Sequence, residues 1–197
     1  MEIDPIDAVE NVEKQAGEKA KRLNMVIAIT IAILASFMGV CKVKDDNIVQ
    51  GMQQAQANKI DHWAFYQARN IREEIAKATL VQLRLAAANS ATQTGYQSAI
   101  ETYEKMAAEQ RLKKDELKAR AEQDQKDYDA ANFRDDQFDL SDALIAIAIS
   151  MLAIAALTQQ WWLYMVTLVP STLGILMGLA GFFGWSIHPD ALMRLLS

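Results

Sequence analysis

Few residues in this chain could do chemistry, and their spacing does not match a catalytic or metal site. The 197 residues include two histidines, His62 and His188, and one cysteine, Cys41. No further histidine or cysteine stands at the spacing that zinc ligands use. A Gly-rich phosphate loop and a nucleophile–base–acid pattern are also missing. We therefore expect no catalytic, cofactor or metal site, no enzymatic activity, and a solvent-facing His62.

Acidic residues gather before a long apolar stretch in the second half of the chain, at Asp135, Asp136, Asp139 and Asp142. Carboxylates in this position could attract a divalent cation near a membrane surface. The alternative, which we favour, is that they cap a helix or remain solvated.

The stretch Asp61–Arg72 combines aromatic and cationic side chains at helical spacing. Trp63 and Tyr66 lie three residues apart, and Arg69 follows three residues later, within reach of a cation–π contact or of the tyrosine hydroxyl. This surface could recognise a protein partner or a lipid. We favour a packing layer in which the two helices of a hairpin, or neighbouring subunits, lock in register. The predicted interaction and packing residues are Trp63, Tyr66, Gln67, Arg69, Ile71, Tyr103, Gly174 and Gly178.

Apolar and charged residues are segregated along the chain. Hydrophobic residues make up 51% and charged residues 23% of the total. The apolar residues concentrate at 25–41, 143–157 and 161–185, and the charges at 1–22 and 42–142. A soluble globule would interleave the two kinds, so this pattern predicts an integral membrane protein. The net charge of −5 argues against nucleic-acid binding.

The sequence predicts an all-α fold, because glycine and proline are few and good helix formers are abundant. We expect three transmembrane helices with a long antiparallel, coiled-coil-like hairpin inserted between the first and the second. Asp45–Asn47 could loosen the helix at the membrane exit, and Asp139 or Ser141 is expected to cap the second span. The predicted parts are an amphipathic segment at 1–22, a first span at 23–41, the hairpin at 42–140 with its turn near 89–95, spans at 141–158 and 161–184, and a tail at 185–197.

The predicted hairpin carries one thin apolar stripe on each helix, with spacings of three, four or seven residues. Its two halves are of similar length, roughly 45 residues or about 65 Å each as helices. Equal lengths are what a hairpin requires if it leaves a membrane and returns to it. The stripe residues are Ile48, Met52, Ala55, Ile71, Ile75, Ala78 and Leu85 in the first half, and Tyr96, Ile100, Tyr103, Met106 or Ala107, Gln110, Leu117, Ala121, Asp124 and Tyr128 in the second.

Small residues and flanking charges suggest how the spans pack and how they are oriented. Gly174 and Gly178 form a GxxxG pair, which we expect to pack within the monomer or between subunits. Basic residues precede the first span, at Lys19, Lys21 and Arg22 among others. By the positive-inside rule they favour a cytoplasmic N-terminus and an extracytoplasmic hairpin.

Two parts of the chain resemble the domain of unknown function 4337 family, which comprises small bacterial membrane proteins. Its Trp-x-x-Tyr-Gln-Ala-Lys motif is similar to Trp63-Ala64-Phe65-Tyr66-Gln67-Ala68-Arg69, and the second half matches at Ile145–Ile149, Leu157-Thr158 and Trp161-Trp162. The resemblance implies one span, a charged helical segment and two further spans in a bacterial inner membrane. The family often has arginines in the last turn, where this chain has Gln159-Gln160. The resemblance implies no activity.

We expect a non-enzymatic membrane protein that forms a homo-oligomeric structural or scaffolding assembly through its hairpin and spans. A lone two-helix hairpin buries too little apolar surface to offset its ordering entropy. Membrane lipid is an expected partner, and an unknown protein could bind the hairpin. The alternative is an oligomeric channel, lined by Thr30, Ser36 or Thr167, or an accessory or regulatory subunit of a transport complex. No span carries a charge in its middle, which disfavours a transporter.

Overall fold

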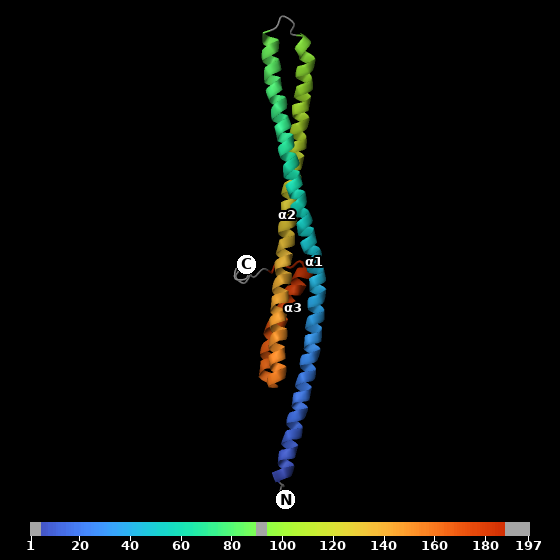
Figure 1. Cartoon of the computed structure of the whole chain (residues 1–197), viewed down its shortest axis with the longest axis vertical. Helices are drawn as coiled ribbons and strands as arrows, with labels where there is room; N and C mark the ends of the chain where they lie inside the picture. The colour runs from blue at the N-terminus through green and yellow to red at the C-terminus, as the bar shows by residue number, and fades with distance from the viewer. Residues whose placement is uncertain (1–4, 90–93, 188–197) are drawn as a thin grey trace. The chain divides into compact units, whose positions relative to one another are not determined.

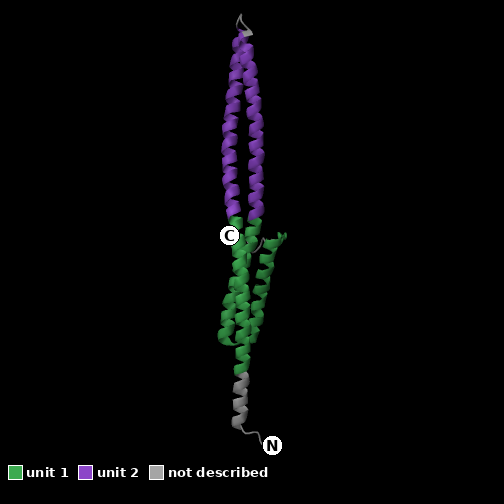
Figure 2. Cartoon of the chain, turned by 90° about the vertical axis from the view of Figure 1, so that its right-hand side faces the viewer, with its two compact units in different colours: residues 1–49, 132–197 green, residues 50–131 purple. Residues whose placement is uncertain are grey.

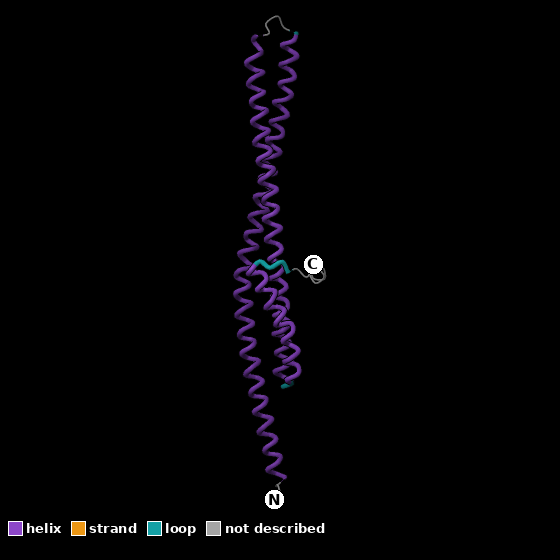
Figure 3. The backbone as a smooth tube through the Cα atoms, turned by 180° about the vertical axis from the view of Figure 1, so that it is seen from behind, coloured by secondary structure: helices purple, strands orange, loops and turns teal. Residues whose placement is uncertain are grey.

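The computed structural model describes residues 5–89 and 94–187, with side chains at 17–89 and 95–187. This part of the chain forms three helices, α1 (Pro5–Ala88), α2 (Thr94–Thr158) and α3 (Trp161–Phe183) (Figure 1). No strand occurs among these residues (Figure 3), so the expected all-α fold is confirmed for them. The expectations for residues 1–4, for the centre of the first turn at 90–93 and for the tail from His188 onward lie outside the described residues.

Both predicted turns lie where the sequence indicates. α1 ends at Ala88, and the N–H of Asn89 donates a hydrogen bond of 3.2 Å to the carbonyl three residues earlier. Gln159, between α2 and α3, has a φ of 54°, a left-handed conformation that ends one helix and lets the chain reverse. Gly184 ends α3 with a φ of 67°, which glycine adopts without a Cβ clash.

The expectation that Asp139 or Ser141 caps a helix was wrong, because α2 continues through both residues. The membrane edges predicted at 22/23 and 41/42 lie within continuous α1, and the one at 140/141 lies within α2. The side-chain amide of Asn47 donates to the Val43 carbonyl of the same helix at 2.8 Å, so it does not break α1. The Ser141 hydroxyl donates to the Gly174 carbonyl of α3 at 2.8 Å and caps nothing. Without glycine or proline at these places, the helical backbone hydrogen bonds continue.

The chain divides into two compact units (Figure 2). Residues 1–49 and 132–197 form one unit, here called the three-helix unit, and residues 50–131 form the two-helix unit. The apolar core of the three-helix unit comes from α1 and α2, with partly buried residues of α3 packed against it. Its buried members are Leu23, Ile27, Leu34, Ile145, Ala148, Leu152 and Ala155.

All three helices are long and apolar enough to cross a membrane, by length and composition. Both the outer surface and the core of the three-helix unit are apolar. Ile29, Ile147 and Val169 are each more than half exposed. A unit that is apolar on both its inside and its outside suits a surrounding of lipid chains better than water.

In the two-helix unit, α1 and α2 pack antiparallel along a seam of buried and half-buried residues. These residues recur at spacings that alternate between three and four. On α1 they are Met52, Ala55, Lys59, His62, Tyr66, Arg69, Glu73, Ala76, Leu80, Leu83 and Ala87. On α2 they are Tyr96, Ile100, Tyr103, Ala107, Gln110, Lys114, Leu117, Ala121, Asp124 and Tyr128.

The predicted α2 stripe matches this seam, with Ala107 in place of Met106 and with Lys114 added. The predicted α1 stripe is correct only at its start, where Met52 and Ala55 lie in the seam. Farther along, Ile71, Ile75 and Leu85 are about 60% exposed, at 60%, 59% and 61%. The seam there is occupied by residues half a turn away, so the prediction for this part of α1 was wrong.

Candidate functional site

The centre of the seam holds a buried charge. Glu73 is 2% exposed, and its carboxylate accepts hydrogen bonds from Lys114 of α2 and Lys77 of α1, with N–O distances of 2.6 Å for both. These two hydrogen bonds, made by cationic donors, hold the pKa of Glu73 below its usual value. The Lys114 ammonium also donates to Asn70 Oδ1 at 3.2 Å. Because a buried charge is costly without its partner, this arrangement favours one register of the two helices.

Two further hydrogen bonds join the helices on the side of the seam toward Met52. His62 Nδ1 lies 2.6 Å from Asp124 Oδ2, a hydrogen bond in which the ring N–H donates to the carboxylate. The Lys59 ammonium donates to Gln125 Oε1 at 2.6 Å. The expectation that His62 faces solvent was therefore wrong, because the seam passes over its face of the helix.

Two of the predicted residues, Tyr66 and Arg69, lie in the seam, and Trp63 contacts the first of them. The rings of Trp63 and Tyr66 contact each other edge to face, with centroids 5.2 Å apart. Arg69 donates from Nη1 to Gln110 Oε1 of α2 at 3.0 Å, rather than to the tyrosine hydroxyl. The segment therefore serves contact between α1 and α2, which is one of the two packing roles that the sequence leaves open.

The other predicted residues of this unit divide between inside and outside. Tyr103 packs against a small buried cluster that includes Ala76, Leu80 and Ala107. Gln67 and Ile71 are exposed on the far side of α1. Of these three residues, only Tyr103 therefore lies in the seam between α1 and α2.

An exposed apolar face runs along α1 opposite the seam. Ile60, Ile71, Ile75 and Leu85, here called the outer stripe, are 58%, 60%, 59% and 61% exposed. They fall on one side of the helix, because at 3.6 residues per turn all four side chains project within an arc of about 80°. Large aliphatic side chains that recur along one exposed face of a helix are typical of a surface that packs against another helix.

Gly174 and Gly178 lie at close contacts within the three-helix unit. A Cβ placed on Gly174 would lie 2.8 Å from Ile145 Cγ1 of α2, and one on Gly178 would lie 2.7 Å from the Phe37 ring of α1. This glycine pair therefore lies at a helix contact within the monomer, where the missing Cβ atoms let α3 approach both other helices.

The hydroxyl residues considered as pore-lining use their protons within their own helices. Thr30 donates to Val26 O at 2.9 Å, and Ser36 donates to Ala32 O at 2.8 Å. Thr167 donates to Tyr164 O at 2.7 Å.

Two buried polar residues of the three-helix unit, Gln137 and Asp45, make contacts that the sequence does not indicate. Gln137 is 1% exposed and donates from Nε2 to the carbonyls of Trp185 and Ile187, at 2.8 and 2.7 Å, which fixes the segment after α3. Asp45 is 3% exposed, and its Oδ2 accepts a hydrogen bond of 2.7 Å from Lys42. Neither residue belongs to a recognisable motif, so periodicity alone could not have found them.

Asp45 and Asp135 form an acid pair between α1 and α2. Asp45 Oδ1 is buried and has no donor among the described residues unless a neighbouring carboxyl carries a proton. Burial, the adjacent Asp45 carboxyl and the charges of Asp139 and Asp136 raise the pKa of Asp135 to about 7. Burial also raises the pKa of Asp139, which Lys42 partly offsets. Below about pH 7 the protonated Asp135 can therefore donate a hydrogen bond to Asp45, instead of being a solvated carboxylate.

We expect this pair to make the protein less stable as the pH rises from about 4 to about 7. Over this range folded Asp135 keeps its proton, whereas the unfolded chain, with a carboxyl pKa of 3.8, has lost it. The folded state then binds more protons, so stability falls with rising pH and levels off above about 7. The melting temperature in detergent should be several degrees lower at pH 8 than at pH 5.

Asp135→Asn should remove most of this fall of the melting temperature with rising pH, because asparagine cannot ionise. The groups facing the pair, which are Lys42 and Asp46 on α1 and Asp136, Asp139 and Asp142 on α2, stay in place in that variant. Exposed Asp115→Asn in the two-helix unit is the matched control and should keep the wild-type slope. The same pH dependence of the melting temperature in wild type and Asp135→Asn would contradict a protonated Asp135 in the folded protein.

No metal site is evident in the part of the chain that the structure describes, since no three His, Cys, Asp or Glu side chains in it are placed to hold one ion.

Comparison with known protein families gives a match over most of the chain. The family model described as Domain of unknown function (DUF4337) matches residues 23–184. No curated protein and no solved structure matches the chain.

Proposed function

Because the chain belongs to the DUF4337 family, whose description assigns no activity, we propose its function from the geometry: a non-enzymatic membrane protein that assembles with copies of itself into a structural scaffold. The observation that carries this proposal is the outer stripe. A two-helix unit with a polar seam has little apolar burial of its own. Covering the stripe with a second copy would supply the missing burial.

The surroundings of the stripe favour a protein partner over lipid. Arg72, Glu74 and Lys77 are exposed on α1 beside Ile71 and Ile75. Hydrocarbon would leave these charges without solvation, which is costly. A helix from a protein can cover the aliphatic side chains and leave the flanking charges in water.

The pattern of charges favours a copy of the same chain as that partner. An apolar row flanked by both acidic and basic residues is self-complementary, because Glu74 of one copy can pair with Arg72 of the next. Coiled-coil helices use flanking charges in this way to select their partners. Each aliphatic side chain removed from water contributes about 1.5–3 kcal/mol when fully buried, so a row of four supports a stable contact.

We further propose that the protein lies in a bacterial inner membrane, with its N-terminus in the cytoplasm and the two-helix unit outside. The basic residues before the first span support this orientation. Whole cells producing a Lys118→Cys, Cys41→Ala variant should react with a membrane-impermeant maleimide. Labelling only after the cells are lysed would reverse the orientation.

Ile71→Lys combined with Ile75→Lys should dissociate the assembly. Both side chains are exposed in the monomer, so the fold should remain, whereas two charges in the stripe make the contact unfavourable. We expect a fall in particle mass by mass photometry in detergent or nanodiscs, with unchanged helix content by circular dichroism.

Leu112→Lys is the matched control for this variant, because Leu112 is a 72% exposed aliphatic residue on α2, outside the stripe. It should keep the wild-type mass. A monomeric wild type at micromolar concentration would overturn the proposal. So would a double variant with the wild-type mass.

A further inference from the structure

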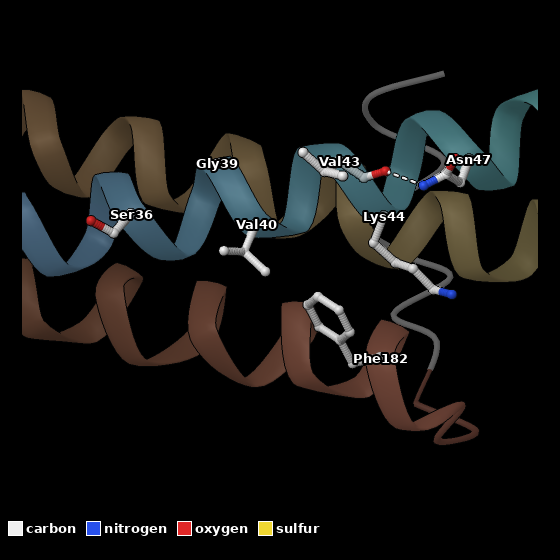
Figure 4. A pocket seen from close by; sticks show the side chains of 7 residues that line it. All are labelled: Ser36, Gly39, Val40, Val43, Lys44, Asn47 and Phe182. Carbon is white, nitrogen blue, oxygen red and sulfur yellow. Dashed lines mark hydrogen bonds between the residues drawn. The ribbon is translucent and has the colours of Figure 1, made fainter.

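The three-helix unit has a groove on its outer surface between α1 and α3 (Figure 4). Its volume is about 460 Å³. Its apolar walls are Gly39, Val40 and Val43 of α1 and the Phe182 ring of α3. Ser36 lies at one end, and Lys44 and Asn47 lie at the other. The groove therefore has an apolar middle and one cationic end.

The apolar part of the groove exists because two features keep it open. Gly39 has no side chain, and a Cβ placed there would have nothing within 4 Å. The Phe182 ring packs edge to face against buried Phe138, with centroids 5.3 Å apart, which holds it as a wall. Val40 and Val43 line the groove and are 59% and 66% exposed, so no other side chain covers them.

The polar end of the groove offers a positive charge and an N–H donor. No hydrogen bond or ion pair engages the Lys44 ammonium among the described residues, whereas the neighbouring Lys42 is bound to Asp45. Asn47 donates one of its two amide hydrogens to Val43 O, which leaves the other for a ligand. An anion at this end would therefore meet both a cation and a neutral donor.

The position of this end in the sequence is that of a membrane surface. The uncharged stretch of α1 ends at Cys41, and the charged residues begin at Lys42. α3 ends close by, since Phe182 lines the same groove and the helix stops at Phe183. Lys44 therefore lies where lipid phosphate groups meet the hydrocarbon, and Gly39 and Val40 lie at the depth of the acyl chains.

We propose that this groove binds one anionic phospholipid of the surrounding bilayer, with an acyl chain along Gly39, Val40 and Phe182 and its phosphate at Lys44 and Asn47. The charge complementarity at Lys44 selects this occupant.

Native mass spectrometry of the full chain in detergent tests the proposal, with phosphatidylglycerol and phosphatidylcholine of identical acyl chains as probes. The wild type should retain phosphatidylglycerol preferentially. Lys44→Ala should reduce that affinity roughly tenfold or more, since it removes a charge-assisted hydrogen bond to the phosphate. Lys118→Ala is the charge control, because Lys118 is an exposed lysine of the two-helix unit, and it should have no effect.

Gly39→Leu should fill the groove and reduce binding of both lipids, whereas Gly51→Leu should leave binding unchanged. The two glycines are matched, since a Cβ at either has nothing within 4 Å and neither variant should misfold. Equal retention of the two lipids by the wild type would overturn the proposal, as would wild-type binding by both Lys44→Ala and Gly39→Leu. A change in particle mass in Gly39→Leu with unchanged lipid binding would assign the groove to a second copy instead.

Discussion

Gly174→Leu is expected to separate α3 from α2 and to destabilise the three-helix unit by about 3 kcal/mol or more, at or above the upper end of the 1–3 kcal/mol that a larger residue in a packed contact typically costs. Even a single Cβ at this position would lie 2.8 Å from Ile145 Cγ1, and 3.2 Å from both Leu144 Cβ and the Ser141 carbonyl oxygen. The Ile145 side chain can rotate away. The other two atoms cannot move unless α2 itself shifts, and a leucine adds three more carbons.

The displacement of α3 should also break a hydrogen bond. The Ser141 hydroxyl donates to the Gly174 carbonyl at 2.8 Å, and both groups are buried. Separation of the helices would leave these polar groups without partners in an apolar surrounding, which adds to the cost.

Thermal unfolding in detergent, followed by circular dichroism and by gel filtration, measures the effect of Gly174→Leu. Gly39→Leu is the control, because it makes the same chemical change in the same unit where a Cβ meets nothing within 4 Å. Its melting temperature should stay within a few degrees of the wild type. Equal melting temperatures for the two variants would show that α3 does not pack on α2 as described.

Phe138→Ala is expected to have an effect of similar size, about 3–5 kcal/mol, the range for removing a buried phenylalanine ring. Phe138 is 1% exposed. Its ring lies against bare Gly181, where an added Cβ would be 2.8 Å from Cε2, and it contacts the Phe182 ring edge to face. Truncation would leave a cavity between α2 and α3 that the surrounding helices can fill only in part.

Phe183→Ala is the matched control for Phe138→Ala. It removes the same ring from the end of α3, where the side chain is 69% exposed, and should change stability by less than about 1 kcal/mol. Chemical denaturation in mild detergent can compare the two variants. A cost for Phe138→Ala no larger than for Phe183→Ala would contradict the packing of this region.

The sequence by itself determined the helical class, the three apolar segments and both turns. These features depend on local properties. Charge-free stretches of about 20 residues, the polar residues near 89–95 and the Thr158–Gln160 turn act through neighbours in the chain. The α2 series of the seam was also readable, because Ile100, Ala107 and Ala121 follow the ordinary spacing of a packed helix face.

Only the tertiary structure decided which face of α1 packs. Hydrophobic periodicity assigned Ile71 and Ile75 to the contact with α2. In the structure that contact holds Glu73, because Lys114 of the other helix neutralises a carboxylate that would otherwise be too costly to bury. The acid pair of Asp45 and Asp135 has the same origin, since the two residues meet only when α1 and α2 are side by side. A pairing between residues far apart in the chain cannot be read from local composition. The acid pair, and the exposure of the outer stripe on the opposite face of α1, are therefore visible only in the tertiary structure.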